Sequence, residues 1–212
     1  MLSEQQIIER RNGIGGSEAA AVLGISRWDS PLSVWHKKVT GFDSKIESEP
    51  MLWGNKLEDV IADEFSQRTG MKLRRVNQTI KHPDYPFLIA NLDRAVVGTD
   101  KIVEIKNVSA YKNDEWLDDE IPIEYVMQCM HYLMVANKES CFAVALINGN
   151  KLVWKEVVRD EEMIKTMMQK EILFWNEFIV KATPPDIDGS EATKELLKTL
   201  YPTAKPDSKI EL

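Results

Sequence analysis

The sequence predicts an α/β fold in which helices flank a central mixed β-sheet. Up to residue 70 the apolar residues follow helical spacing, whereas from residue 72 they recur at every second position, as in strands. A helix, a hairpin and another helix come next, and this order suits one domain built around a mixed sheet. At 212 residues the chain is long enough for one well-formed core and short for two.

The first part of the chain contains four predicted helices, at residues 4–11, 18–23, 31–40 and 50–69. Ser3, Ser17 and Ser30 are candidate N-caps, because a serine hydroxyl can accept from the free N–H groups of a first helical turn. Gly70 follows the longest helix as a stop signal. Its predicted buried stripe consists of Trp53, Leu57, Val60, Ile61 and Phe65.

The middle of the chain predicts a run of strands, at residues 72–80, 87–91, 94–97 and 102–108. A helix is then expected at residues 121–136. The strongest hairpin signal joins strands 140–147 and 152–158 through Asn148-Gly149-Asn150.

The last long helix is predicted at residues 160–181, with Met168, Ile172, Trp175 and Ile179 on its buried stripe. A short helix should follow at residues 190–200. We therefore expect a single domain over residues 1–185 and a C-terminal tail with one short helix over residues 186–212.

The net charge of −7 is unevenly distributed along the chain. Residues 1–112 carry 16 Lys and Arg against 15 Asp and Glu, whereas residues 113–212 carry 11 against 19. A locally positive groove is compatible with such a chain if some acids of the first part bind a metal ion. Candidates for its basic lining are Arg27, Lys37, Lys38, Arg74 and Arg75.

Membrane and disulfide-rich classes are disfavoured by composition. No run approaches the ~18 consecutive apolar residues of a membrane span. The two cysteines, Cys129 and Cys141, suit a reduced intracellular protein.

A hard-cation site is predicted on the strand at residues 102–108. Glu104 and Lys106 share one face of this strand, because side chains alternate faces. Asp93, from a neighbouring strand, would join them, and the Ile105 carbonyl lies between the two side chains. Two carboxylates and a carbonyl suit Mg²⁺, and Lys106 could orient a nucleophilic water. The alternative is an ordinary Glu–Lys face at a strand edge.

Two helices carry further candidate residues. Glu58 borders the buried stripe of its helix and could reach a second metal ion, although most helical glutamates are solvated. Gln128 and Tyr132 lie one turn apart on one helix face and can hydrogen-bond into an active site. The alternative for this pair is a polar flank of a packed helix. His36, His82 and His131 are interpreted as structural or surface residues.

The segment from Arg10 to Ser17 predicts an anion site. It combines Arg10 and Arg11 with a glycine-rich turn, and an arginine can hold a phosphate through two hydrogen bonds. The alternative is a glycine turn with a serine N-cap.

Taken in order, four motifs resemble the YqaJ-type viral recombinase family, which includes phage lambda exonuclease, within the PD-(D/E)xK nuclease superfamily. These motifs are Arg10…Gly-Ile-Gly-Gly-Ser17, Trp53-Gly…Glu58, Asp93…Glu104-Ile-Lys106 and Gln128…Tyr132. The resemblance covers roughly residues 8–185. It implies a restriction-endonuclease-like core with a central mixed sheet.

The resemblance also implies an activity. Such enzymes are Mg²⁺-dependent, with Mn²⁺ as a substitute, and degrade one strand of linear double-stranded DNA from its 5′ end. They form a ring-shaped homotrimer and leave a 3′ overhang for a single-strand annealing protein. A phage or prophage protein in the cytoplasm of a bacterial host is the implied setting.

Residue roles follow from matching each motif. The resemblance implies Asp93, Glu104 and the Ile105 carbonyl as metal ligands, with Lys106, Glu58, Gln128 and Tyr132 as catalytic residues. It implies Arg10 and Ser17 as the pocket for the 5′-phosphate, with Arg11 as a rival for Arg10. Asn91 replaces a family serine at this pocket, and Met51 matches an apolar wedge between the terminal bases.

The chain departs from the family pattern beside the first acid. Leu92 stands where proline is expected, and Arg94 stands where glycine is frequent, so that it could contact a phosphate or narrow the site. Two other functions remain open from the sequence. One is a structure-specific or restriction-like endonuclease, and the other is a non-catalytic DNA-end-binding protein.

Overall fold

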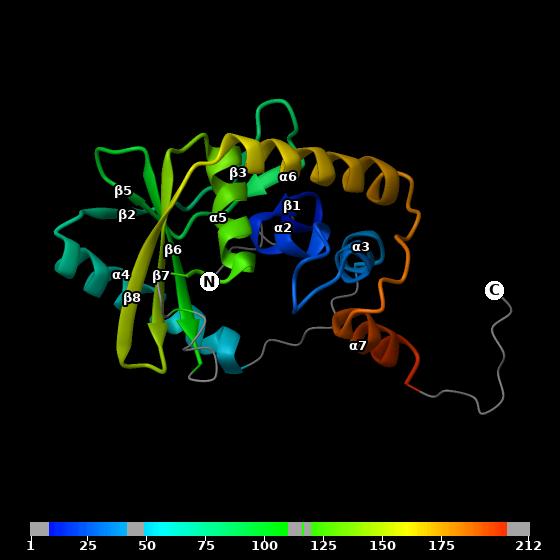
Figure 1. Ribbon diagram of the computed structural model, residues 1–212, viewed down its shortest axis with the longest axis horizontal. Helices are drawn as coiled ribbons and strands as arrows, with labels where there is room; N and C mark the ends of the chain where they lie inside the picture. Colours follow the sequence, from blue (N-terminus) through cyan, green and yellow to red (C-terminus); the bar gives the residue numbers. More distant parts are fainter. Residues whose placement is uncertain (1–8, 42–48, 110–115, 117–119, 203–212) are drawn as a thin grey trace, which may run out of the picture.

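The computed structural model of the chain describes residues 9–41, 49–109, 116 and 120–202. Its centre is a five-stranded sheet with the strand order β2-β5-β6-β7-β8 (Figure 1). The sheet is mixed, because β6 pairs in parallel with β7 and antiparallel with β5. These strands are β2 Leu73–Arg75, β5 Arg94–Val96, β6 Lys101–Val108, β7 Ser140–Ile147 and β8 Lys151–Val158.

A second, three-stranded sheet has the order β1-β4-β3. Its strands are β1 Ile14–Gly15, β4 Leu88–Ala90 and β3 Ile80–Lys81. The helices are α2 Gly16–Val22, α3 Pro31–Val39, α4 Glu49–Thr69, α5 Ile123–Ala136, α6 Glu161–Phe174 and α7 Glu191–Leu200, with a π-helical turn, Trp175–Ile179, at the end of α6.

Alternation along β6 assigns its two faces to two different layers. Val103 and Ile105 belong to a core cluster with Ile61 and Phe65 of α4. Ile102 belongs to the larger cluster on the α5 side. The sheet is therefore covered by α4 on one face and by α5 on the other, and Glu104 faces the α5 side.

The predicted strand at residues 72–80 is wrong as one element. It splits into β2, which pairs with β5, and β3, which pairs with β4 in the other sheet. The partners β4 and β5 separate at residues 91–93, so that a continuous strand could not pair with both. The sequence pattern continues across this break because both pieces are partly buried.

The buried stripe predicted for α4 is wrong in part. Ile61 and Phe65 are buried, but Trp53 and Val60 are 49% and 59% exposed. The core contacts of α4 come from Leu57, Ile61, Ala62 and Phe65, whereas other residues of its first half line a cleft described below. Core burial therefore does not extend along the whole helix.

The stripe predicted for α6 is displaced by one residue. The buried residues of α6 are Ile164, Met167, Glu171 and Phe174, whereas Met168 and Trp175 are only partly buried. The sequence pattern did not predict the buried face of α6, because a glutamate such as Glu171 is expected to be solvated. In the structure Glu171 is fully buried as the partner of His131.

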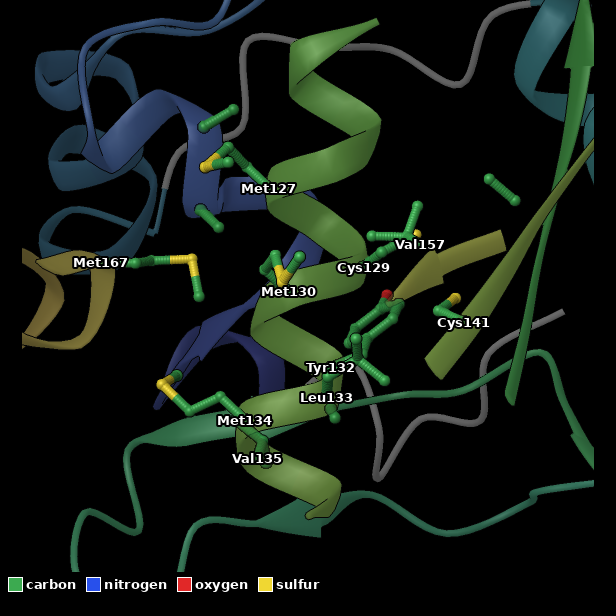
Figure 2. Close-up of a cluster of buried hydrophobic side chains, with 14 of the residues drawn as sticks. Met127, Cys129, Met130, Tyr132, Leu133, Met134, Val135, Cys141, Val157 and Met167 are labelled. Carbon is green, nitrogen blue, oxygen red and sulfur yellow. The ribbon is translucent and has the colours of Figure 1, made fainter. Parts of the chain in front are cut away.

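Helix α5 passes through the middle of the larger core cluster. Figure 2 shows Met127 and Met134 directed toward α2 and α6, and Cys129 directed toward Cys141 of β7. Both cysteines are buried and unbridged. The methionines fill the irregular space between three helices, a role that suits their flexible side chains.

Helix starts confirm the prediction in one case and correct it in another. Ser30 caps α3, accepting from the Ser33 N–H at 3.2 Å. Ser17 is not an N-cap, because α2 begins at Gly16 and its N-cap is Gly15. The Glu18 side chain satisfies the Gly15 N–H at 3.0 Å instead. The predicted Ser3 cap and most of helix 4–11 lie outside the described residues.

In the described part of the chain, no helix has the length and apolar character needed to cross a membrane.

A buried ion pair joins α5 to α6. His131 Nδ1 lies 2.9 Å from Glu171 Oε1, and Nε2 lies 3.0 Å from the Ile89 carbonyl oxygen. Two acceptors around one ring suit the imidazolium form, which donates from both nitrogens. Burial lowers the pKa of His131, but the Glu171 carboxylate outweighs it, and with a contribution from Glu18 the pKa lies above its usual value.

This pair predicts a pH-dependent stability. A raised pKa in the folded state gives a contribution that is complete below the unfolded pKa of ~6.5 and is lost as the pH rises through the folded pKa. The substitution Glu171→Gln should therefore cost about 3–5 kcal/mol at pH 6, and the gap to the wild type should narrow by pH 9. Urea unfolding at both pH values measures it, with exposed Glu162→Gln as the control. A gap independent of pH would contradict the charged pair.

Candidate active site

The floor of the site is built by β6 and the turn before β5. Asp93 Oδ2 accepts from the Ile105 backbone N–H at 2.7 Å, which fixes Asp93 against the middle of β6. Glu104 Oε1 accepts from Lys106 Nζ at 2.6 Å. The structure therefore brings Asp93, Glu104 and Lys106 together as the strand alternation predicts.

The two carboxylates, Asp93 and Glu104, share a single ammonium group, that of Lys106. Glu104 is 3% exposed, and its Oε2 is buried without a hydrogen-bond partner. Burial, followed by the charge of Glu104, raises the pKa of Asp93 well above its usual value. A buried unpaired carboxylate oxygen costs free energy that a cation would recover.

The backbone adds a third oxygen at the same point. A strand residue directs its N–H and C=O to the same side, so the Ile105 carbonyl faces the side on which its N–H meets Asp93. No group of three or more His, Cys, Asp or Glu side chains forms a metal cage within the described residues. Two carboxylates and one carbonyl nevertheless fit Mg²⁺, which keeps several waters and uses few protein ligands.

Lys106 is held protonated beside this pair. Burial lowers its pKa, but the charges of Glu104 and Asp93 outweigh burial and raise it above the usual value. The Nζ atom also lies 5.2 Å from the centre of the Tyr125 ring. Lys106 is therefore a fixed cation at the edge of the site.

Helix α5 supplies a second polar pair. Gln128 Nε2 donates to Glu104 Oε1 at 2.6 Å and to Tyr132 Oη at 3.0 Å. Burial, followed by the charges of Glu104 and Asp93, raises the pKa of Tyr132 well above its usual value. Tyr132 therefore remains a neutral phenol, and Gln128 couples it to the orientation of Glu104.

On the opposite wall, α4 meets a buried arginine. Arg94, 5% exposed, donates to Glu58 Oε1 and to Asp59 Oδ1, both at 2.5 Å. It also donates to the Asp93 carbonyl oxygen at 2.6 Å. Glu58 thus lies at the site but is paired with Arg94, a partner that the sequence analysis missed. A basic residue directly after Asp93, with adjacent acids on α4, was the available signal.

The rim of the site contains the residues matched to the phosphate pocket. Arg10 Nη2 donates to Ser17 Oγ at 2.8 Å. Asn91 lines the same cleft, with its Oδ1 accepting from Thr79 Oγ1 at 2.9 Å. Met51 is 51% exposed at the same rim.

The structure separates Arg10 from its rival Arg11. Arg11 packs against the end of α3, where a Cβ built on Gly41 would lie 1.9 Å from its Nη2. Arg10 instead lines the cleft. The structure therefore places Arg10, rather than Arg11, on the cleft.

Lys38 positions Arg10, a role that the sequence did not reveal. The Lys38 side chain is 1% exposed, bonds the Arg10 carbonyl oxygen at 2.8 Å and pairs with Glu18 Oε2 at 2.8 Å. The prediction that Lys38 lines a basic channel is therefore wrong. The ion pair ties α2 to α3, and the hydrogen bond to Arg10 ties the segment before α2 to α3.

All eleven candidate residues line one cleft of about 660 Å³. They come from five places in the chain: the segment that leads into α2 together with the first turn of α2, the first half of α4, the β4–β5 turn, β6 and α5. A carboxylate pair, a fixed ammonium and an arginine–serine pair thus face one space.

Gly16 permits the close contact between α2 and α5 on which this arrangement rests. A Cβ on Gly16 would lie 2.5 Å from Tyr132 Cε1. The substitution Gly16→Ala should displace Tyr132 and lower the free energy of unfolding by about 1–3 kcal/mol. Gly15→Ala is the matched control, because its Cβ meets nothing closer than Glu18 Oε2 at 4.0 Å. Equal losses in urea unfolding for both variants would refute the contact.

Comparisons with known proteins agree with the fold and with the sequence motifs. Residues 8–139 match the YqaJ-like viral recombinase domain. The protein YqaJ of Bacillus subtilis (strain 168) is 42% identical over 215 residues, which cover 100% of this chain and 67% of that protein.

Solved structures share the architecture at low identity. The alkaline exonuclease LHK-Exo from Laribacter hongkongensis superposes with a TM-score of 0.72 at 18% identity, covering 95% of this chain and 100% of that one. A phage-related exonuclease from Haemophilus somnus 129PT gives 0.64 at 12% identity, covering 80% and 96%. The fold is thus the predicted PD-(D/E)xK type, and the chain belongs to the YqaJ-like viral recombinase domain family.

Proposed function

We propose that this protein is a Mg²⁺-dependent exonuclease that degrades one strand of linear double-stranded DNA from its 5′ end. The proposal rests chiefly on one observation. Asp93 and Glu104 lie beside Lys106, and one buried oxygen of Glu104 has no hydrogen-bond partner. The Arg10–Ser17 pair lines the same cleft. Such an enzyme needs a site that cleaves phosphodiesters and, at one end of that site, a second site that binds an anion.

Membership of the family supports the choice of reaction. LHK-Exo and the Haemophilus somnus protein, which share the fold, are named as exonucleases. The cleft also provides polar and cationic groups from several elements, as a bound nucleic acid strand requires.

The chemistry follows from the positions of the described residues. Asp93, Glu104 and the Ile105 carbonyl would hold the ion, with Mn²⁺ able to replace Mg²⁺. A bound Mg²⁺ supplies Lewis-acid activation of the phosphate and of the attacking water. Lys106 orients that water and stabilises the negative charge that develops on the phosphate.

The remaining site residues keep this arrangement rigid. Gln128 donates to Glu104 and to the neutral phenol of Tyr132, so that Glu104 cannot rotate away from the ion. Glu58, held by Arg94, contributes a carboxylate on the opposite wall. Preorganised groups of this kind lower the reorganisation cost of the reaction.

End recognition is assigned to the rim. Arg10 and Ser17 would bind the 5′-phosphate, with the Asn91 amide beside them, because a guanidinium can donate two parallel hydrogen bonds to a phosphate. Met51, exposed at the rim, would separate the terminal base pair. Degradation from this end leaves a 3′ single-stranded overhang.

The family resemblance supports three further parts of the proposal. The enzyme would act as a ring-shaped homotrimer around DNA and hand its overhang to a single-strand annealing protein. Its place would be the cytoplasm of a bacterial cell that carries a phage or prophage.

End dependence tests the proposal. With Mg²⁺, the wild type should degrade linear duplex bearing a 5′-phosphate faster than the same duplex with a 5′-hydroxyl, and should leave closed circles intact. The substitution Arg10→Ala should remove this preference and slow digestion by ~10-fold or more, since a charge-assisted hydrogen bond contributes roughly 1.5–3 kcal/mol. Quantifying end-labelled products over time gives both rates.

Arg11→Ala is the matched control, and it should digest like the wild type because Arg11 lies away from the cleft. Equal cutting of closed circles would indicate an endonuclease instead. Loss of the 5′-phosphate preference in Arg11→Ala but not in Arg10→Ala would reverse the assignment of the two arginines.

A further inference from the structure

Gly54 lies inside α4, where neither conformation nor packing calls for glycine. Its φ angle is not among the positive values, and a Cβ built there meets no heavy atom within 4 Å. Glycine in a helix interior is nevertheless less stable than alanine, because the unfolded glycine has more backbone freedom to lose. Gly54 thus lowers the stability of the helix, and no contact or backbone angle among the described residues requires a glycine there.

The face on which Gly54 lies gives a reason for this cost. Met51, Gly54, Asn55 and Glu58 all line the cleft. Their spacing of three and four residues places them on one stripe of the helix. A side chain at Gly54 would therefore enter the cleft between Met51 and Glu58.

Its position along the helix places Gly54 beside the proposed cleavage point. At ~1.5 Å of rise per residue, Gly54 lies about 6 Å from Glu58 along the α4 axis and about 4.5 Å from Met51. Glu58 is bound to Arg94, which also contacts the Asp93 carbonyl. Gly54 thus lies between the proposed wedge and the groups that act on the phosphate.

We propose that Gly54 leaves room for the sugar–phosphate backbone of the strand being cut, which packs against α4 at van der Waals distance. Glycine serves this purpose wherever a ligand must approach a protein backbone closely. Asn55, its neighbour in the cleft, carries an amide that can donate to a phosphate oxygen. The inference rests on the proposed function and makes Gly54 a positioning residue for DNA.

A size series at this position tests the inference. Gly54→Ala and Gly54→Leu are placed in an Asp93→Asn parent, which should bind DNA without consuming it. Gly54→Ala should raise the Tm by about 2–4 °C, as removal of a helical glycine does in a chain of this size. Both substitutions should lower the affinity for a fluorescent 5′-phosphorylated duplex, by about 10-fold or more for Gly54→Leu. Fluorescence anisotropy measures this affinity.

Asp63→Ala and Asp63→Leu are the matched controls. Asp63 is exposed and lies nine residues after Gly54, on the opposite side of α4 at ~100° per residue. Both controls should bind the duplex like the parent. Unchanged affinity in Gly54→Ala and Gly54→Leu overturns the inference, as does an equal loss in the Asp63 variants. A parent that binds no duplex, with a wild type that cuts none, refutes the proposed function itself.

Discussion

The site depends on negative charge that the fold buries at the middle of β6. A carboxylate removed from water is costly unless charge or hydrogen bonds compensate it. Here Lys106 and Gln128 satisfy one oxygen of Glu104, and the Ile105 N–H satisfies one oxygen of Asp93. The second oxygen of Glu104 has no partner. The protein thus compensates most of this negative charge, and a divalent ion would compensate the rest.

This charge is accessible because two sheets diverge beside it. β4 and β5 follow each other in sequence but pair in different sheets, and Asp93 lies in the turn between them. The cleft opens at this divergence. Two ion pairs hold the surrounding elements together: Arg94 of β5 pairs with Glu58 of α4, and Lys38 of α3 pairs with Glu18 of α2 and also donates to the Arg10 carbonyl. Removing such a partner would leave an uncompensated buried charge, so these pairs fix the width of the cleft.

The sequence predicted correctly the features that depend on a regular spacing or on residues close together in the chain. Strand alternation placed Glu104 and Lys106 on one face, and the one-turn spacing of Gln128 and Tyr132 paired them correctly. It failed where a distant partner decides the outcome. Glu171 reads as solvated until His131 is brought against it, and this concealed the register of α6. Lys38 reads as a surface cation, yet Glu18 and the Arg10 carbonyl bury it.

Two further predictions were wrong. Val60 and Trp53 follow the apolar spacing of α4, but Val60 lies about 100° around the helix from the buried Ile61, and Trp53 lies two turns before Val60 on the same side, so both remain exposed. The break in the strand at residues 72–80 depends on where β4 and β5 part, which local spacing does not encode. The separation of β4 from β5 therefore has two consequences. It breaks the strand predicted at residues 72–80, and it opens the cleft.

Calorimetric titration of Mn²⁺ into the DNA-free protein tests the central claim, that Asp93 and Glu104 await a divalent ion. The wild type should bind Mn²⁺, and Asp93→Ala and Glu104→Gln should each lose that binding while they remain folded. Glu156→Gln, an acid of β8 paired with Lys101 outside the cleft, should bind like the wild type. Equal Mn²⁺ binding by all four proteins would contradict the account.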